Sequence, residues 1–427
     1  MEKKFQFFRK LLLLTLLMLG VGSAFGAGEK CAAGTQWGGF TTVVANKGSD
    51  DYYEINTPEE LAWFSCEITK NGGSSQKTNA KLMQSIDLQG KLFIPISAGK
   101  GTPSYGGTFD GQGFSIKNLF IKGSEVVKSE NGGKPVYAQN IGLFAVLREG
   151  TVKNLSLENV SIYAESSAGD AGTSGTSNPI SVGAVVGFIE SGTVDGCVVS
   201  GKIETSGSIN RVGGVAGNVW AATISNSISE VDVIATGDNT HVGGIVGAIR
   251  NDKVSGTVTL SSCVYSGETL FSNNGSVGAI AGNYEKTVNI TTNDLYYTAA
   301  YDAVGTGLGN KPFNSEQVEN LNTEDVICEL NGGTWSVDNK TCSGGASNGV
   351  WSEGQDNLSI NGSDGFKVTF DPNGGSFDEG VKAYKFFAKG ATITANEIEN
   401  PTFAGKKFVG WSLTEGGDVQ DLGTADK

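Results

Sequence analysis

The stretch from Val182 to Ile203, VGAVVGFIESGTVDGCVVSGKI, is one copy of a pattern that recurs through the middle of the chain. Related copies begin at Ile141, Val212, Val242 and Val277. The starts at 182, 212 and 242 are 30 residues apart, whereas the intervals before and after them are 41 and 35 residues because of insertions at 164–179 and 251–258. Each copy contains β-branched runs of strand length separated by Gly, Ser and Asn, so each predicts several short strands.

A unit of about 30 residues made of short strands cannot bury its apolar face alone, so consecutive units are expected to stack. Stacking equivalent strands about 4.8 Å apart produces parallel pairing. The sequence therefore predicts an all-β fold whose main body, residues 52–300, is a right-handed parallel β-helix, which is a solenoid. The alternative is a β-sandwich with coincidental periodicity.

The repeated glycines have an expected role in this stack. Only Gly avoids a steric penalty where the chain bends sharply or where a packed backbone leaves no space for Cβ. The structural repeat glycines are Gly183, Gly187, Gly213, Gly214, Gly217, Gly243, Gly244, Gly247, Gly278 and Gly282.

The repeats and the block that precedes them resemble the GLUG-motif β-helix proteins of bacterial surfaces, over about Tyr52 to Thr298. The motifs that carry this resemblance are V-G-G-[IV]-[VA]-G in the repeats, Tyr52-Tyr53-Glu54-Ile55, Glu60-Leu61-Ala62-Trp63-Phe64, Asn79-Ala80-Lys81-Leu82, Ile86-Asp87-Leu88 and Tyr105-Gly106-Gly107-Thr108-Phe109-Asp110-Gly111. The resemblance implies an exported surface protein that binds a ligand.

A helix is predicted at Thr57–Lys70, before the repeats. Thr57-Pro58-Glu59-Glu60 has the form of a capping box with Pro at the first helical position, and Leu61, Phe64 and Ile68 give one apolar face. The first coil of a parallel solenoid exposes unpaired strand edges, and native edges are often covered by a helix. This helix is therefore expected to be the N-terminal cap.

Residues 1–26 have the features of a cleaved secretory signal peptide. Basic residues precede the apolar run Leu11–Leu19, which is too short to span a bilayer, and Ala24 and Gly26 suit cleavage before Ala27. The predicted location is extracellular or at the cell surface, with no transmembrane segment after cleavage; residues 27–51 form an N-terminal segment.

The charge of the chain argues against polyanionic partners. Its formal charge is −14, and removing four positive and one negative residue with the signal peptide gives −14 − 4 + 1 = −17. No basic stripe offsets this charge in the sequence, so nucleic acid and anionic lipid are not expected partners.

Six cysteines in an exported chain suggest disulfides. Cys197 and Cys263 occupy the same place two repeats apart, about 9.6 Å at the usual strand spacing, so they are expected to be free, buried thiols. Cys328 and Cys342 flank a turn at Asn331-Gly332, and a local bridge is expected there. Cys31 and Cys66 remain, and they either form a second bridge or stay reduced.

After Thr298 the repeat pattern ends, and residues 301–342 are predicted to contain the disulfide hairpin and one or two short helices, starting at Asn314 and at Asn322 or Thr323. Residues 343–365, rich in Ser, Gly, Asn and Asp, are predicted to be a linker. Residues 366–427 form a distinct module, in which Val368 and Phe370 alternate in a strand, Asn373-Gly374-Gly375 turns, and Phe408 and Trp411 return to the core. These motifs resemble the Listeria-Bacteroides repeat, the B-repeat of internalin-like surface proteins, which implies a small β-grasp-like unit that is incomplete here.

The sequence carries few residues suited to catalysis. No metal-binding spacing, nucleophile elbow, P-loop or cofactor motif is present, so no catalytic residue, metal or cofactor is predicted. The single histidine, His241, is expected to be a solvated side chain in a turn. The carboxylates that could serve a polysaccharide lyase or glycoside hydrolase are Asp87, Asp110, Asp195, Asp232 and Glu204, and for Asp87 and Asp110 a role in turn formation is favoured.

The predicted function is therefore an adhesin-like, non-catalytic surface protein that contacts polysaccharide or a host or neighbouring surface protein through the β-helix face. Trp220, Tyr265 and Tyr284 are the expected binding aromatics. A β-helix polysaccharide lyase or glycoside hydrolase is the first alternative. A structural spacer that displays the C-terminal module is the second.

Overall fold

The computed structural model divides into two compact units, Met1–Gln317 and Val318–Lys427. Its described residues are 31–70, 76–98, 103–131, 134–137, 139–165, 180–207, 210–250, 256–285, 287–298, 313, 315–318, 324–331, 333–336, 339–344, 351–353, 358–360, 366–369, 376, 384–387 and 401–402. The predicted signal peptide and the aromatic pair Phe408 and Trp411 lie outside these residues. Within the described part, no helix is long and apolar enough to cross a membrane.

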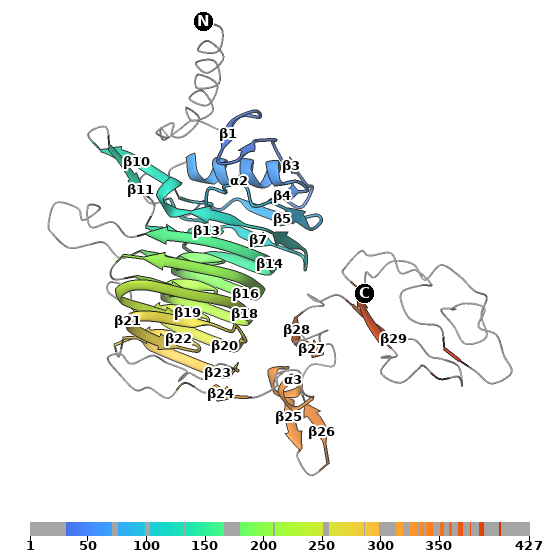
Figure 1. The fold of residues 1–427 in the computed structure, drawn as a ribbon. Coiled ribbons are helices and arrows are strands. Elements are labelled where there is room, and N and C mark those ends of the chain that lie inside the picture. The colour runs from blue at the N-terminus through green and yellow to red at the C-terminus, as the bar shows by residue number, and fades with distance from the viewer. Residues whose placement is uncertain are drawn as a thin grey trace, which may run out of the picture. The chain divides into compact units, whose positions relative to one another are not determined.

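The first unit is dominated by one large sheet in which equivalent strands of successive repeats pair in parallel (Figure 1). Its long central strands are β14 (Gly150–Glu165), β16 (Val186–Ser206), β18 (Ala216–Gly243), β20 (Thr257–Tyr265), β21 (Leu270–Gly278) and β23 (Asn289–Tyr297). Val182 pairs with Val212, and Val212 pairs with Val242, so the 30-residue interval of the sequence is the pairing register. This parallel pairing is incompatible with an antiparallel β-sandwich.

Shorter strands complete the sheet. Those before the repeats are β3 (Asn46–Lys47), β4 (Tyr52–Ile55), β5 (Asn79–Leu82), β6 (Ile86–Asp87), β7 (Thr108–Asp110), β8 (Ser115–Lys117) and β9 (Phe120–Lys122). Those within and after the repeats are β12 (Asn140–Ile141), β13 (Phe144–Leu147), β15 (Ser181–Gly183), β17 (Arg211–Gly213), β19 (Val246–Ile249), β22 (Ala281–Tyr284) and β24 (Ser315–Gln317). Among the described residues, these strands pair in parallel, except β3 with β4. A separate antiparallel hairpin joins β10 (Val127–Asn131) to β11 (Lys134–Tyr137), and a 3-10 turn, η1, covers Gly123–Glu125.

In-register stacking places like residues above one another in the core. Val152, Val194, Ile224 and Leu260 follow one another across four neighbouring strands, and each is fully buried. Cys197 and Cys263 lie in another such column, separated by Ser227, and both are free and buried. The two thiols are therefore separated by a full strand, as their repeat positions predict.

The repeat glycines are required for space rather than for an unusual backbone angle. A Cβ on Gly217 would lie 2.3 Å from the backbone nitrogen of Val182, and a Cβ on Gly247 would lie 2.4 Å from that of Val212. Neither glycine has a positive φ. Two backbone segments of neighbouring repeats therefore approach each other more closely than any side chain permits.

The helix α2 (Pro58–Lys70) lies at the N-terminal end of the stack, where the sequence predicts a cap (Figure 1). Thr57 Oγ1 accepts a hydrogen bond from Glu60 N at 3.2 Å, and Thr57 N donates to Glu60 Oε2 at 3.1 Å, which completes the predicted capping box. Phe64 contacts Tyr105 and Phe109 in the core, with ring centroids 6.0 and 6.2 Å apart. The helix therefore closes the apolar end of the stack.

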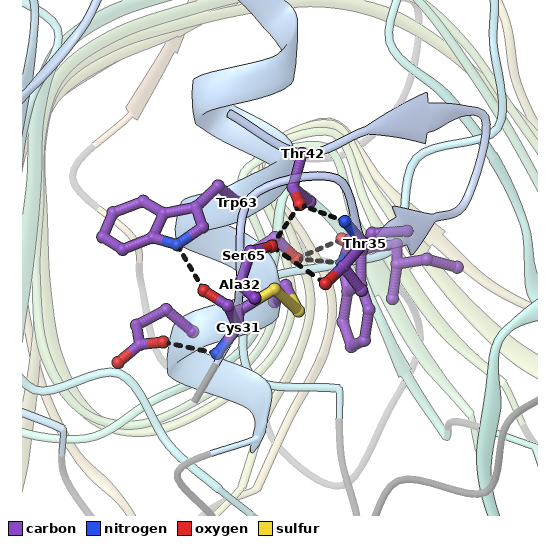
Figure 2. The surroundings of a disulfide bond; sticks show 10 residues. Cys31, Ala32, Thr35, Thr42, Trp63 and Ser65 are labelled. Carbon is purple, nitrogen blue, oxygen red and sulfur yellow. Dashed lines mark hydrogen bonds between the residues drawn. A yellow bond between two sulfur atoms is a disulfide. The ribbon is translucent and has the colours of Figure 1, made fainter. Parts of the chain in front are cut away.

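Residues 31–47 hold α2 from its other side. The chain forms a small hairpin of β1 (Gln36–Trp37) and β2 (Phe40–Thr41), and a disulfide joins Cys31 to Cys66 of the helix (Figure 2). Trp63 Nε1 donates to Cys31 O at 2.8 Å, and Cys31 N donates to Glu67 Oε2 at 2.9 Å. Of the two states that the sequence leaves open for these cysteines, the structure contains the bridge.

The second unit contains a short helix, α3 (Glu324–Leu330), followed by antiparallel strands β25 (Gly333–Ser336) and β26 (Thr341–Gly344). The expected disulfide Cys328–Cys342 joins the helix to β26. The predicted helix start at Asn314 is wrong, because the next residues, β24, pair in parallel with β23 and extend the sheet of the first unit. Pairing with the edge strand β23 stabilises a strand at 315–317 more than the capping signal of Asn314 stabilises a helix.

The predicted linker is also more structured than its composition suggests. Within 343–365, β27 (Trp351–Glu353) pairs with β28 (Leu358–Ile360). Asn331 holds Trp351 by two hydrogen bonds, from Asn331 Nδ2 to Trp351 O at 2.9 Å and from Trp351 N to Asn331 Oδ1 at 3.0 Å, and Trp351 is buried. In the C-terminal module, β29 (Phe366–Thr369) pairs with β30 (Tyr384–Phe387), and Val368 lies in a strand as predicted. Phe370 and Asn373-Gly374-Gly375 lie outside the described residues.

We predict that Gly217→Ala lowers the free energy of unfolding by about 2 kcal/mol, because the added methyl group forces two backbones apart. Urea unfolding measures this change. Gly123→Ala is the matched control, because its Cβ would meet atoms no closer than 3.4 Å. Equal unfolding midpoints for the two variants would contradict the assigned close approach.

Replacing both Cys31 and Cys66 with Ser is expected to destabilise the first unit by about 4 kcal/mol, from the loop entropy of a 35-residue separation. Urea unfolding of the mature chain, monitored by tryptophan fluorescence, measures this loss of stability. The paired change Cys328→Ser with Cys342→Ser serves as the control, since it removes a bridge of the other unit and should leave the transition of the first unit unmoved.

Candidate functional site

Two of the three aromatics predicted to bind a ligand lie in the interior. Tyr265 is 0% exposed and Tyr284 is 1% exposed, so the prediction is wrong for both. Tyr265 pairs with Ser229 of the preceding repeat, and its ring fills the space that a Cβ on Gly244 would need. Tyr284 pairs with the core residue Ile249. Both rings replace smaller core residues of the repeat.

The third aromatic, Trp220, is half-buried on β18. Its ring meets that of Phe188 edge to face, with centroids 4.7 Å apart. Phe188 comes from the preceding repeat, where it pairs with Asn218. Trp220 therefore remains available to a ligand on an outward surface.

Among the described residues of the first unit, the most exposed aromatic rings lie elsewhere, on the outer side of β14 and β21. Tyr163 is 43% exposed and Phe271 is 45% exposed. The parallel register places them in one column whose members, in order, are Lys122, Tyr163, Glu204, Ile234 and Phe271. Phe120 supports Tyr163, with ring centroids 6.2 Å apart. This column presents apolar and charged groups side by side.

A groove of about 300 Å³ is built on this column. We call it the Tyr163 groove, and its lining residues are Lys122, Ser124, Tyr163, Ala164, Glu165, Glu204, Thr205, Ser206, Ile234 and Thr236. They come from four neighbouring strands, β9, β14, β16 and β18, and from the η1 turn. The groove therefore runs across strands rather than along one strand.

The polar groups of the Tyr163 groove differ in how far they are already engaged. Lys122 forms an ion pair with Glu125 at 2.6 Å, and Glu204 forms one with Lys202 at 2.9 Å. Thr205 is 4% exposed, and its Oγ1 has no hydrogen-bond partner among the described residues. Thr205 aligns with the buried residues Ala164 and Ala235, so its side chain faces inward and its hydroxyl is not offered to a ligand.

The candidate carboxylates of a glycosidase mostly serve turns and strand pairing. Asp87 accepts from Gln89 N at 2.7 Å and from Asn118 Nδ2 at 2.8 Å. Asp110 accepts from Gln112 N in the same way. The hydrogen bond from Asn118 lowers the pKa of Asp87, whereas a general acid needs a raised pKa.

The remaining acids follow a similar pattern. Asp195 accepts from Ser225 Oγ at 2.7 Å and from Asn226 Nδ2 at 2.8 Å, and Asp232 accepts from Thr269 N at 2.7 Å. Glu204, in its ion pair with Lys202, is the one of the five predicted acids that lines the Tyr163 groove. Asp110 and Asp195 lie in one column on either side of Lys153, and Lys153 forms an ion pair with Asp110 at 3.3 Å. Asp232 pairs with Lys202, the ion-pair partner of Glu204. The acids therefore fall into separate groups in which a lysine lies between the carboxylates.

His241 is not a solvated turn residue, and that expectation is wrong. It lies near the end of β18, half-buried, with Nδ1 2.7 Å from Ser276 Oγ and Nε2 3.1 Å from Asn283 Nδ2. Burial, followed by the charges of Arg211 and Arg250, lowers the pKa of His241 to about 4. The ring is therefore neutral at pH 7.

Other reactive groups do not form a site in the described part of the chain. Burial raises the pKa of Cys197 and of Cys263 to about 12, which keeps both thiols protonated and poorly nucleophilic. No cluster of three His, Cys, Asp or Glu side chains suited to a metal occurs among the described residues.

Sequence reasoning missed Tyr163 because it weighed aromatics without their inward or outward direction. The signal was present in the repeat alignment, where Ile162 aligns with Ile203 and Val233 in the core column. Side chains alternate along a strand, so the neighbour of Ile162, Tyr163, must face outward.

Comparison with known proteins gives little further guidance. No family model and no curated protein matches the chain. A solved structure, described as a "putative immunoglobulin A1 protease" from Bacteroides ovatus, matches with a TM-score of 0.44 and 16% identity, covering 71% of this chain and 94% of that one. A likeness of this size decides neither the fold nor the function.

The lowered pKa of His241 predicts a pH dependence of stability. The unfolded chain binds a proton near pH 6.5 and the folded chain only near pH 4, so the stability present above pH 6.5 is lost as the pH falls toward 4. We expect a loss of about 2 kcal/mol, with allowance for the partly exposed ring. Urea unfolding between pH 4 and 7 measures it. His241→Gln should remove this component, and an unchanged pH profile in that variant would contradict the assignment.

Proposed function

We propose that this protein is an exported, non-catalytic, adhesin-like protein whose repeats form a right-handed parallel β-helix, and that it binds polysaccharide through the Tyr163 groove. The observation that carries the proposal is the exposed Tyr163 ring beside hydrogen-bonding side chains in a groove of about 300 Å³.

The pairing pattern supports the proposed β-helix. Equivalent residues of successive repeats pair in parallel and in register, and each repeat contributes several strand stretches to one buried core. A chain that returns to pair with itself in parallel every 30 residues has to coil around that core. Parallel crossovers are right-handed in nearly all proteins, which gives the hand of the coil.

The groove suits a saccharide for chemical reasons. The apolar face of a sugar ring packs on an exposed aromatic side chain, while its hydroxyls need donors and acceptors at the rim. Tyr163 supplies the ring, and Glu204, Glu165 and Thr236 supply polar atoms. Because the column extends over several repeats, it can contact successive sugars of a chain.

A binding role is favoured over glycoside cleavage by the state of the acids. Asp87 and Asp110 already accept hydrogen bonds that stabilise turns, and Asp195 and Asp232 each accept one from a neighbouring repeat. Cleavage requires two carboxyl groups about 5 to 10 Å apart across one bond, with the acid held protonated.

Export and surface display are supported by three features. The N-terminal sequence has the form of a signal peptide, and two disulfides are typical of oxidising compartments. The resemblances to GLUG-motif proteins and to the Listeria-Bacteroides repeat favour a cell-surface location by association.

The test is a glycan-array screen with the mature chain, residues 27–427, in which bound protein and released reducing sugar are measured in the same wells. We expect retention without release. Tyr163→Ala should weaken binding of the retained glycan at least tenfold, because it removes the stacking ring.

Two variants serve as controls. Tyr163→Phe keeps the ring and should keep most of the affinity, and Val43→Ala changes an exposed apolar residue outside the groove and should have no effect. Absence of any glycan binding would overturn the proposal, and release of reducing sugar would overturn its non-catalytic part.

A further inference from the structure

Two exposed aromatic rings occupy one position of the repeat register. Among the described residues, the large hydrophobic side chains that remain exposed are Val43, Val44, Met83, Tyr163 and Phe271. Of these, Tyr163 and Phe271 carry rings, and both belong to the column that contains Glu204 and Ile234, which we call the Tyr163 column. Rings that are distant in the sequence therefore stand in one line on the surface.

Phe271 extends the apolar surface beyond the Tyr163 groove. Its neighbour Leu270 pairs with Val233, and both are buried in the core. Side chains alternate along a strand, so Phe271 is directed outward. It pairs with the groove residue Ile234, although it does not itself line the groove. The ring therefore adds an apolar surface one strand further along the stack.

The Tyr163 column crosses the strands at the spacing of the sheet. Tyr163, Glu204, Ile234 and Phe271 belong to β14, β16, β18 and β21. These strands are separated by three intervals, which place the two rings about 14 Å apart at the usual spacing of parallel strands. A pyranose ring in an extended β-1,4-linked chain has about the length of one interval. Four successive sugars therefore span the distance between the rings.

A second line of side chains runs beside this column. We call it the polar row, and its members are Glu165, Ser206, Thr236 and Asn273. Each follows a member of the column by two residues, so it lies on the same side of the sheet, and each is exposed or half-buried. Glu165 pairs with Ser206, so the row keeps the register of the column. Thr236 Oγ1 donates to Thr205 O at 3.3 Å and keeps its lone pairs for a ligand.

The direction of these two lines favours a glycan over a peptide. A peptide that adds a strand to a sheet edge runs along the strands, because it pairs with their backbone. The Tyr163 column and the polar row run across the strands, where a ligand meets side chains instead.

The charged members of the column do not select a charged ligand. Lys122 is in an ion pair with Glu125, and Glu204 is in an ion pair with Lys202. Their charges are therefore compensated within the protein, and the two exposed rings remain as the main contact surfaces of the column.

We propose that the Tyr163 groove and Phe271 form one site for an extended β-1,4-linked glycan of at least four sugars that lies across the strands. This inference rests on the saccharide binding proposed above. The two rings stack on the first and last sugars of the stretch, and Ile234 contacts the chain between them. The polar row binds hydroxyls along one edge of the glycan. Since both rings engage one molecule, the second contact is intramolecular and increases the affinity for the longer chain.

The experiment measures affinity against chain length by calorimetry with the mature chain. The probes are cellobiose, cellotetraose and cellohexaose, which are β-1,4-linked glucose chains of two, four and six units. We expect cellotetraose to bind at least tenfold more tightly than cellobiose, because the longer chain reaches both rings. Maltohexaose, whose α-1,4 linkages make the chain curve, should bind at least tenfold more weakly than cellohexaose.

Phe271→Ala tests the second ring. It should weaken cellotetraose binding at least tenfold and leave cellobiose binding within twofold, whereas Tyr163→Ala should weaken both. Phe271→Tyr keeps a ring and should keep most of the affinity. Met83→Ala changes an exposed apolar residue outside the column and should alter neither value.

Equal affinities for cellobiose and cellotetraose, equal affinities for maltohexaose and cellohexaose, or an unchanged cellotetraose affinity in Phe271→Ala would overturn this inference. A dimer of the mature chain that Phe271→Ala dissociates in sedimentation would instead assign the column to contact between two copies. Failure of cellohexaose to bind, while another glycan is retained on the array through Tyr163, would overturn this inference and leave the proposed saccharide binding intact. Absence of binding to every glycan would overturn both.

Discussion

The structure depends on parallel backbone pairing between repeats that are 30 residues apart in the sequence. Each repeat completes its hydrogen bonds on its neighbours, and each apolar residue packs above an equivalent one, as in the column from Val152 to Leu260. This pairing requires two backbone segments to approach within a distance that excludes Cβ, which is why glycine stands at positions such as Gly217 and Gly247.

The same register determines what the surface can do. Residues that are about 30 positions apart become neighbours, so an isolated Tyr163 becomes part of a column with Glu204 and Ile234. Ligand contacts can therefore be assembled from single residues of several repeats, without any local motif. The proposed saccharide groove has this origin, on the outward column that contains Tyr163.

The polar residues of the repeats divide into those that stabilise the stacked strands and those that keep unsatisfied polar atoms. Asp87 and Asp110 serve turns, where short side chains that accept backbone hydrogen bonds stabilise a bend, and Asp195 accepts from side chains of the next repeat. Asn218 and Trp220 instead retain unsatisfied polar atoms in the described part of the chain. Within the described residues, this division favours recognition by outward columns over chemistry by an assembled acid pair.

The sequence by itself determined the repeat period, the parallel pairing, the cap helix from Pro58, the need for small residues at the repeat glycines and the separation of Cys197 from Cys263, because each depends on local pattern or on spacing along the chain. Only the tertiary structure decided which aromatics are exposed. Tyr265 and Tyr284 occupy core positions that other repeats fill with smaller residues. The identity of an aromatic residue in the sequence does not show whether its side chain faces inward or outward. The strand at Ser315–Gln317, the hairpin at Trp351 and the surroundings of His241 likewise depended on partners that are distant in the sequence.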